Sequence, residues 1–189
     1  MYRRCTTPKT THQQHHFIRT LLSMLQQQTF GEITVSALCE RAGLTRNIFY
    51  RLFDSKQDVL RAMVDFAITG YVSYQPPGDP ALWQQGSGLV AFFQYWKDQK
   101  QLLDALERNG LSTLLLERSM LYVFNEDYDT LRLFRGNKPE NVTQVMLYHI
   151  SGLMTLVLSW HYSGYRKSPE EMAAVTQYIL DNPPMSAEN

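Results

Sequence analysis

The sequence has only two cysteines among its 189 residues, Cys5 and Cys39. Two cysteines build neither a disulfide framework nor a cysteine-based zinc site, and Cys39 lies on the apolar face of a predicted helix. This usage fits a reducing compartment, so we expect a cytoplasmic protein.

The sequence also has no stretch that is typical of a targeting signal. Arg3 and Arg4 are followed by polar residues instead of the apolar core of a signal peptide. We find no apolar run of membrane-spanning length, and therefore expect that the protein has no membrane partner.

Motifs for catalysis are missing as well. The chain contains no nucleophile motif, no glycine-rich phosphate loop and no cluster of metal-ligand residues. We therefore expect neither enzymatic activity nor a cofactor. No strand pattern, internal repeat or low-complexity tract competes with the helical periodicity of the sequence.

The histidines do not change this expectation. His12, His15 and His16 share one helical face and could in principle hold a metal, but no Cys, Asp or Glu lies nearby to complete a site. An exposed polar face near phosphates is the favoured interpretation. His149 and His161 point in different directions from one predicted helix, which indicates histidines of the core or of a pocket.

The net charge is zero, but the charges are unevenly distributed. Residues 1–60 carry eight Lys and Arg residues against four acidic residues, so this part has an excess of four positive charges and the remainder an excess of four negative ones. A basic front joined to an acidic rear is typical of a nucleic-acid-binding domain attached to a body that does not bind nucleic acid.

The stretch 33–56 combines two helix starts with a tight turn. Thr34 or Ser36 can cap a first helix, which should end at Gly43 because glycine tolerates the left-handed backbone that closes a helix. Thr45 can then cap a second helix. Two helices joined in this way predict a helix-turn-helix unit.

In the second helix the residues Phe49, Leu52 and Phe53 face the core and leave a polar, basic face for a groove of DNA. Arginine can pair with guanine, asparagine with adenine, and tyrosine with a phosphate. Lys56 starts the next helix, where its ammonium would lie near a phosphate. The residues that we expect to contact DNA are Thr34, Ser36, Thr45, Arg46, Asn47, Tyr50, Arg51 and Lys56.

These residues resemble the N-terminal domain of the TetR family of bacterial transcriptional regulators, over roughly residues 15 to 60. The matching positions are Ala42, Gly43, Leu44, Thr45, Phe49, Tyr50, Phe53, Ser55 and Lys56. Ile48 stands where the family commonly has Thr or Ser, and Leu52 where it commonly has His. The resemblance therefore leaves the base sequence of the operator open.

The periodicity and the resemblance together predict an all-α protein of about nine helices, with a helix-turn-helix three-helix domain followed by a helical C-terminal dimerisation and ligand-binding domain. The expected organisation is a flexible arm over residues 1–9, the DNA-binding domain over 10–54 and the C-terminal domain over 55–189. Besides the helix-turn-helix pair, we expect helices from Thr10 or Thr11 to about Gln28, from the cap Ser55 to about Tyr74, and over 81–97, 100–109, 111–133, 140–164 and 169–180. A loop should occupy 75–80. Gly70 is either a flexible point or a glycine tolerated late in its helix.

The C-terminal domain carries two apolar surpluses. The run 89–96 is apolar almost all round its helix, and the resemblance implies a small-molecule pocket, although plain core packing is the alternative for each side chain. The expected pocket residues are Phe92, Phe93, Tyr95, Trp96, Arg118, Tyr122, Met146 and His149. The last two helices are expected to form a dimer interface through Val145, Leu153, Val157, Trp160, Met172, Val175 and Ile179.

The resemblance implies a homodimer that binds a palindromic operator in double-stranded DNA. We expect a repressor that a small apolar or aromatic effector releases from its operator. The alternative is a similar regulator that a protein partner controls, acting as an adaptor or an activator without a small-molecule effector.

Overall fold

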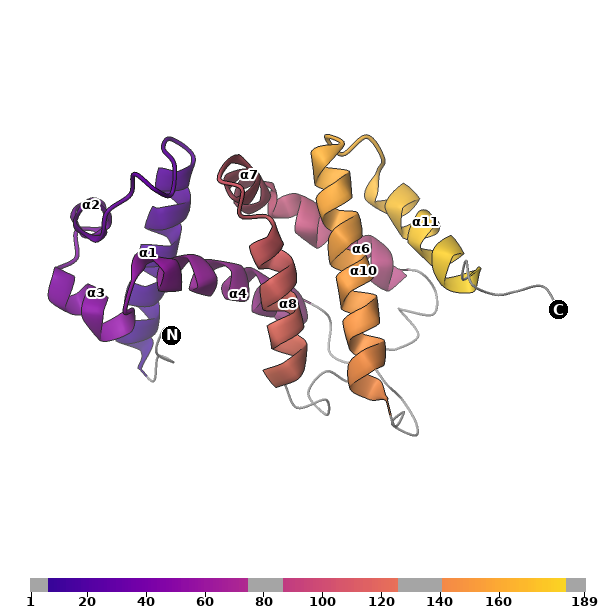
Figure 1. Cartoon of the computed structure of the whole chain (residues 1–189), viewed down its shortest axis with the longest axis horizontal. Helices are drawn as coiled ribbons and strands as arrows, with labels where there is room; N and C mark the ends of the chain where they lie inside the picture. Colours follow the sequence, from indigo (N-terminus) through magenta and orange to yellow (C-terminus); the bar gives the residue numbers. More distant parts are fainter. Residues whose placement is uncertain (1–6, 75–86, 126–140, 183–189) are drawn as a thin grey trace. The chain divides into compact units, whose positions relative to one another are not determined.

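A computed structural model describes residues 7–74, 87–125 and 141–182. All regular structure in these ranges is helical, which confirms the expected all-α class (Figure 1). The described helices are α1 (Pro8–Leu25), α2 (Val35–Ala42), α3 (Arg46–Leu52), α4 (Lys56–Tyr74), α6 (Ser87–Asp98), α7 (Lys100–Arg108), α8 (Thr113–Asn125), α10 (Val142–Tyr162) and α11 (Pro169–Asp181).

Helix α1 begins earlier than expected, because Thr7 caps it. The hydroxyl oxygen of Thr7 accepts the backbone N–H of Thr10, and the Thr10 hydroxyl oxygen accepts the N–H of Thr7 in return. Pro8 occupies the first helical position, where its missing N–H costs nothing. The segment 7–9, expected in a flexible arm, therefore forms the cap and first turn. The helix ends at Leu25, not at Gln28.

The other boundaries agree closely with the expected ones. Gly43 ends α2 in the left-handed conformation with φ 62°, and the Ser55 hydroxyl accepts the N–H of Asp58 at the start of α4. The expected loop at 75–80 and the helical ends over 81–86 and 126–133 lie outside the described residues.

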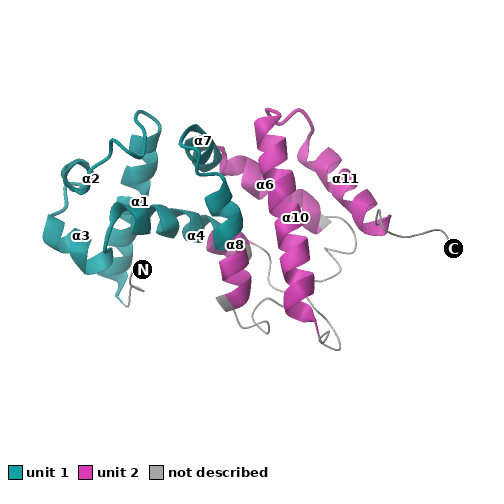
Figure 2. Ribbon diagram, in the orientation of Figure 1, with its two compact units in different colours: residues 1–68, 101–118 teal, residues 69–100, 119–189 magenta. Residues whose placement is uncertain are grey.

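The chain divides into two compact units (Figure 2). Unit 1 comprises residues 1–68 and 101–118, and unit 2 comprises 69–100 and 119–189. Helices α4 and α8 each contribute to both units, while α7 belongs with the N-terminal helices. The expected functional boundary between residues 54 and 55 stays a prediction.

The core of unit 1 is aromatic. Phe17 of α1 meets Phe49 of α3 edge to face, with ring centroids 5.4 Å apart, and meets Phe53 at 6.0 Å. All three rings are fully buried. Such pairs stabilise by about 0.5–1.5 kcal/mol beyond the area that they bury, so they fix α3 on α1.

In unit 2, α11 and α10 both pack on α6. The side chains of Phe92, Phe93 and Trp96 are fully buried, and Phe93 meets Trp160 of α10 edge to face at 5.5 Å. Within the described residues, α10 is long and apolar enough to cross a membrane by length and composition alone. The expectation that no apolar run reaches this length was wrong, since its 21 residues carry no Asp, Glu, Lys or Arg.

Gly70 lies where α4 meets Tyr95 of α6. A Cβ atom at Gly70 would come within 2.6 Å of the Tyr95 hydroxyl oxygen. The ring of Tyr95 also contacts those of Tyr71 and Tyr74, and burial raises the pKa of Tyr95 to about 12. The glycine thus permits close approach of a tyrosine, which is neither of the two roles that the sequence suggested.

Gly70→Ala should therefore destabilise the protein by about 1–3 kcal/mol, the typical cost of overpacking a core. In a Tyr95→Phe background the same change should cost less or become stabilising, because the nearest remaining ring atom is 3.7 Å away and alanine is the better helix former. Urea unfolding of both single variants and the double variant measures this coupling. Additive effects would contradict the contact.

Candidate nucleic-acid interface

The segment from Thr34 to Phe53 forms two short helices with local caps at each end. The hydroxyl oxygen of Thr34 accepts the N–H of Ala37, and that of Thr45 accepts the N–H of Ile48. Between the helices, Gly43 and Leu44 direct their N–H groups back to carbonyls of α2. These bonds fix the angle at which α3 leaves the turn.

Arg46 and Tyr50 form a pair on the exposed face of α3. The guanidinium of Arg46 donates to the Tyr50 hydroxyl oxygen at 3.2 Å and lies 5.7 Å from the centroid of its ring. This hydrogen bond raises the pKa of Arg46 further above its usual range, so the side chain stays cationic. Tyr50 is 44% exposed and rests edge-on against the buried Phe49. The pair therefore presents a charge and a ring to solvent from a rigid base.

The smaller predicted contacts are also accessible. Ser36 and Asn47 are exposed, as are Thr34 and Thr45. Both threonine hydroxyls accept a capping bond, which leaves each hydroxyl hydrogen able to donate to a phosphate oxygen. These four side chains thus lie at the N-terminal ends of α2 and α3 and present hydrogen-bond donors at the surface.

Arg51 lies at the edge of this face. Its Nη2 donates to the side-chain oxygen of Gln13 at 3.0 Å, which ties the last turn of α3 to α1. Gln13 is buried, an unusual environment for a glutamine, and Arg51 explains it. Gln13 was not expected from the sequence, because its contact with Arg51 depends on how α3 packs on α1.

Lys56 begins α4, as the sequence predicted, and its ammonium is bonded within the protein. Its ammonium donates to the carbonyls of Phe30 at 2.7 Å, Gly31 at 3.2 Å and Ile33 at 2.6 Å, and sits 4.7 Å from the Phe30 ring centroid. An ammonium has three N–H donors, and three acceptors are in reach. This arrangement fits a lysine that holds the connection between α1 and α2 better than one that contacts a phosphate.

The N-terminal histidines contact protein groups. His16 Nε2 lies 2.9 Å from the carbonyl oxygen of Ala42, so the ring donates to the end of α2, and His15 packs against Phe66 with centroids 4.4 Å apart. Burial, with smaller effects of Arg19 and His12, lowers the pKa of His15. Within the described residues, no three His, Cys, Asp or Glu side chains gather as a metal site.

The predicted pocket residues separate into several environments. Phe92, Phe93 and Trp96 form the core of unit 2, and Tyr95 is half-buried beside them. The buried indole N–H of Trp96 has no acceptor among the described residues.

The other pocket candidates have other neighbours or lie on other helices. Met146 packs in a cluster with Val123 and Val142. His149 is half-buried beside the ring of Tyr148, and Tyr122 is half-buried on α8. The pocket remains a prediction that no single group of these residues defines.

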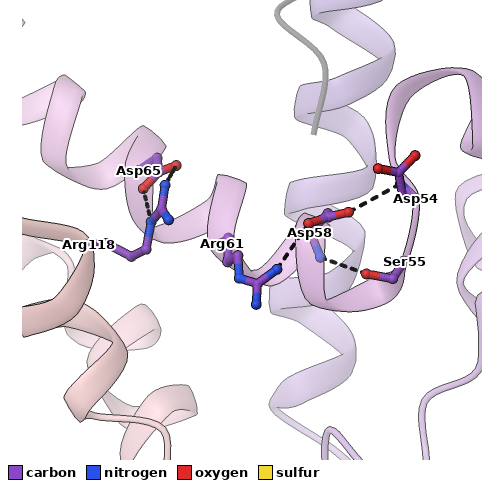
Figure 3. A network of polar contacts seen from close by, with 6 residues as sticks. All are labelled: Asp54, Ser55, Asp58, Arg61, Asp65 and Arg118. Carbon is purple, nitrogen blue, oxygen red and sulfur yellow. Dashed lines mark hydrogen bonds and ion pairs between the residues drawn. The ribbon is translucent and has the colours of Figure 1, made fainter. Parts of the chain in front are cut away.

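Arg118 belongs to unit 1 and is engaged in an ion pair. Its Nε and Nη2 each lie 2.6 Å from one carboxylate oxygen of Asp65, a bidentate arrangement that joins α8 to α4 (Figure 3). On the same helix, the buried carboxylate of Asp58 accepts from Arg61 and from the N–H of Asp54. Arg118 therefore orients α8, which leaves little reason to place it against an effector.

The predicted dimer residues are also divided by burial. Val157, Trp160 and Met172 are buried within the single chain, so their side chains are not available on its surface. Val145 and Leu153 are half-buried, while Val175 and Ile179 are exposed. Two further exposed tyrosines of α10, Tyr148 and Tyr162, were not expected from the sequence, and Tyr178 of α11 is exposed as well.

Comparison with known proteins places the helix-turn-helix segment. Residues 17–63 match the family of bacterial regulatory proteins described as the tetR family. Among solved structures, the chain is similar to a tetR-family transcriptional regulator from Streptomyces coelicolor, with 16% sequence identity and a TM-score of 0.51. The match covers 90% of this chain and 78% of that one, and at this identity it shows a shared fold. No curated protein sequence matches the chain.

Proposed function

We propose that the chain is a transcriptional regulator of the TetR family, because residues 17–63 match the model of that family. In this proposal it is a homodimeric repressor that a small effector releases from its operator. The observation that carries the proposal is the Arg46–Tyr50 pair, a cation and a ring held on the exposed face of α3 above an aromatic core. This face suits the major groove, where the early residues of a second helix read bases.

The contacts divide by chemistry. Arg46 and Asn47 have the donor and acceptor groups that pair with guanine and adenine edges, whereas Tyr50 and the capping hydroxyls of Thr34 and Thr45 suit phosphates. Ser36, at the start of α2, adds a further phosphate donor. Arg51 contributes positive charge near the groove while it holds α3 to α1. Since DNA is the target, we place the protein in the cytoplasm.

The proposed dimer surface runs along α10 and α11. On α10 the residues Tyr148, Gly152, Thr155, Ser159 and Tyr162 recur at alternating spacings of four and three and are all exposed. This spacing forms a straight seam on a helix, and its small central residues allow a second helix to approach closely. The hydroxyl of Thr155 donates to the carbonyl of Ser151 on the same helix, so its donor is already satisfied within the chain.

On α11, Tyr178 is 68% exposed and lies beside the exposed Val175 and Ile179. A pair of helices with this much uncovered apolar surface suits a four-helix interface between two copies of the chain. A two-fold dimer would present α3 twice to a palindromic operator.

The proposed effector site lies in unit 2, where Phe92, Phe93 and Trp96 are buried and the indole N–H of Trp96 finds no acceptor in the part of the chain that the structure describes. A buried N–H without a partner destabilises a protein by about 1–3 kcal/mol, so a ligand that supplies an acceptor would gain from meeting it. A flat apolar molecule with one acceptor atom fits this chemistry. The proposal assigns the protein no catalytic activity.

The experiment that tests the function is selection of duplex DNA from a random pool by the full-length protein. A palindromic consensus is expected, and its affinity should fall steeply with salt because the basic face releases counterions from the duplex. Arg46→Ala should relax the preference at one base position and weaken binding by about 1–3 kcal/mol.

Two matched variants sharpen this test. Tyr50→Phe keeps the ring beneath Arg46 but removes the hydroxyl, so it should weaken binding less than Tyr50→Ala does. Lys56→Met should lower the melting temperature and leave the salt dependence of DNA binding unchanged, since its ammonium bonds to carbonyls within the protein.

A selected pool without a consensus sequence, or an Arg46→Ala protein that binds DNA as tightly as the wild type, would argue against the exposed face of α3 as the DNA-binding surface. A compound screen on the bound complex then separates control by a small molecule from control by a protein partner.

Gly152 provides the test of the dimer. A Cβ atom there meets nothing within 4 Å, so the single chain accommodates a larger side chain. Gly152→Arg should yield a species of 22.0 kDa in sedimentation, where the wild type sediments at twice that mass, and should lose affinity for the palindrome. Gly152→Ala is the control and should stay dimeric. A dimeric Gly152→Arg protein would exclude this seam.

A further inference from the structure

The connection between α1 and α2, residues 26–33, is contacted by a helix that lies far away in the sequence. Helix α7 joins unit 1, although the chain on either side of 101–118 belongs to unit 2. It buries the apolar side chains of Leu102, Leu103, Ala105 and Leu106 and directs polar groups of its last turn to the connection. These polar contacts have no role in the proposed reading face itself.

Asn109 makes the central contact. Its side-chain oxygen accepts the backbone N–H of Phe30 at 2.6 Å, and its side-chain nitrogen donates to the carbonyl of Ala105 at 2.7 Å. The second bond fixes which way the amide points, because only the nitrogen can donate to a carbonyl. The oxygen is thereby held toward Phe30.

Arg108 makes the neighbouring contact. Its guanidinium donates to the side-chain oxygen and to the backbone carbonyl of Gln26, the residue that caps the end of α1. The side-chain nitrogen of Gln26 donates in turn to the carbonyl of Gln101 at the other end of α7. The capping residue of α1 is therefore bonded to both ends of α7.

Phe30 is held from a second side by α4. The carbonyl of Phe30 accepts from Lys56, and its ring lies under the same ammonium. Four residues later Thr34 caps α2. The backbone of Phe30 is thus fixed between α7 and α4 immediately before the helix-turn-helix pair begins.

We propose that Arg108 and Asn109 are positioning residues for DNA binding. By fixing the path of residues 26–33, they set where α2 and α3 lie, and base reading tolerates errors of only about half an ångström in such a placement. The inference rests on the proposed function. The segment 101–118, which contains most of α7, is joined to unit 2 by the chain at each of its ends.

The test compares full-length variants on the duplex that the wild type selects. Asn109→Ala should weaken binding about tenfold, within the usual range of couplings between sites, and should leave the salt slope unchanged because no phosphate contact is removed. Asn109→Asp keeps the acceptor for Phe30 and should retain more affinity. Gln101→Ala is the matched control on the same helix, since only the carbonyl of Gln101 makes the contact.

Amide hydrogen exchange, compared with the affinity of the same variant, separates a local change at Phe30 from a general loss of stability. In Asn109→Ala the amide of Phe30 should exchange faster, while buried amides of α1 and α3 keep their protection. If Asn109→Ala fails to fold, Arg108→Ala decides, because its hydrogen bonds to Gln26 are exposed to solvent and make only a modest net contribution to stability.

Weaker binding by a folded Asn109→Ala or Arg108→Ala protein supports the inference. Wild-type affinity in folded variants, with wild-type DNA selection intact, would overturn the inference alone. A wild type that selects no DNA would contradict the proposed function and the inference together.

Discussion

The position of the helix-turn-helix pair depends on the edge-to-face packing of Phe17 against Phe49 and Phe53. This packing holds α3 against α1, and Arg51 adds a hydrogen bond to Gln13 of α1. Arg46 and Tyr50 project from the opposite side of the same short helix. A seven-residue helix is not stable alone, so the exposed pair is only as ordered as the aromatic core beneath it.

The parts that local chemistry determines were predictable from the sequence. Thr34, Gly43 and Thr45 cap helices through bonds to residues close by in the sequence, and the structure confirms all three caps. The start of α1 is also determined locally, but it was not predicted. In its capping box, Thr10 takes the place of the Glu or Gln that usually pairs with a residue such as Thr7.

Contacts between distant segments were not predictable in this way. The ammonium of Lys56 binds backbone carbonyls of residues 30–33, so its position depends on the conformation of that segment. Asn109, which is distant in the sequence, binds the backbone of the same segment. The apolar residues of α10 and α11 show a related limit. Periodicity marks Trp160 and Val175 alike as apolar, but it does not tell whether a side chain faces its own core or another chain.

The central claim is that a symmetric dimer places two copies of α3 in successive major grooves of one operator. Hydroxyl-radical and methylation footprints of the full-length protein on its selected duplex test this directly. Two protected major-groove segments, related by the two-fold axis of the palindrome and one helical turn or more apart, are the predicted result. A single protected segment, or protection confined to the minor groove, would contradict the account.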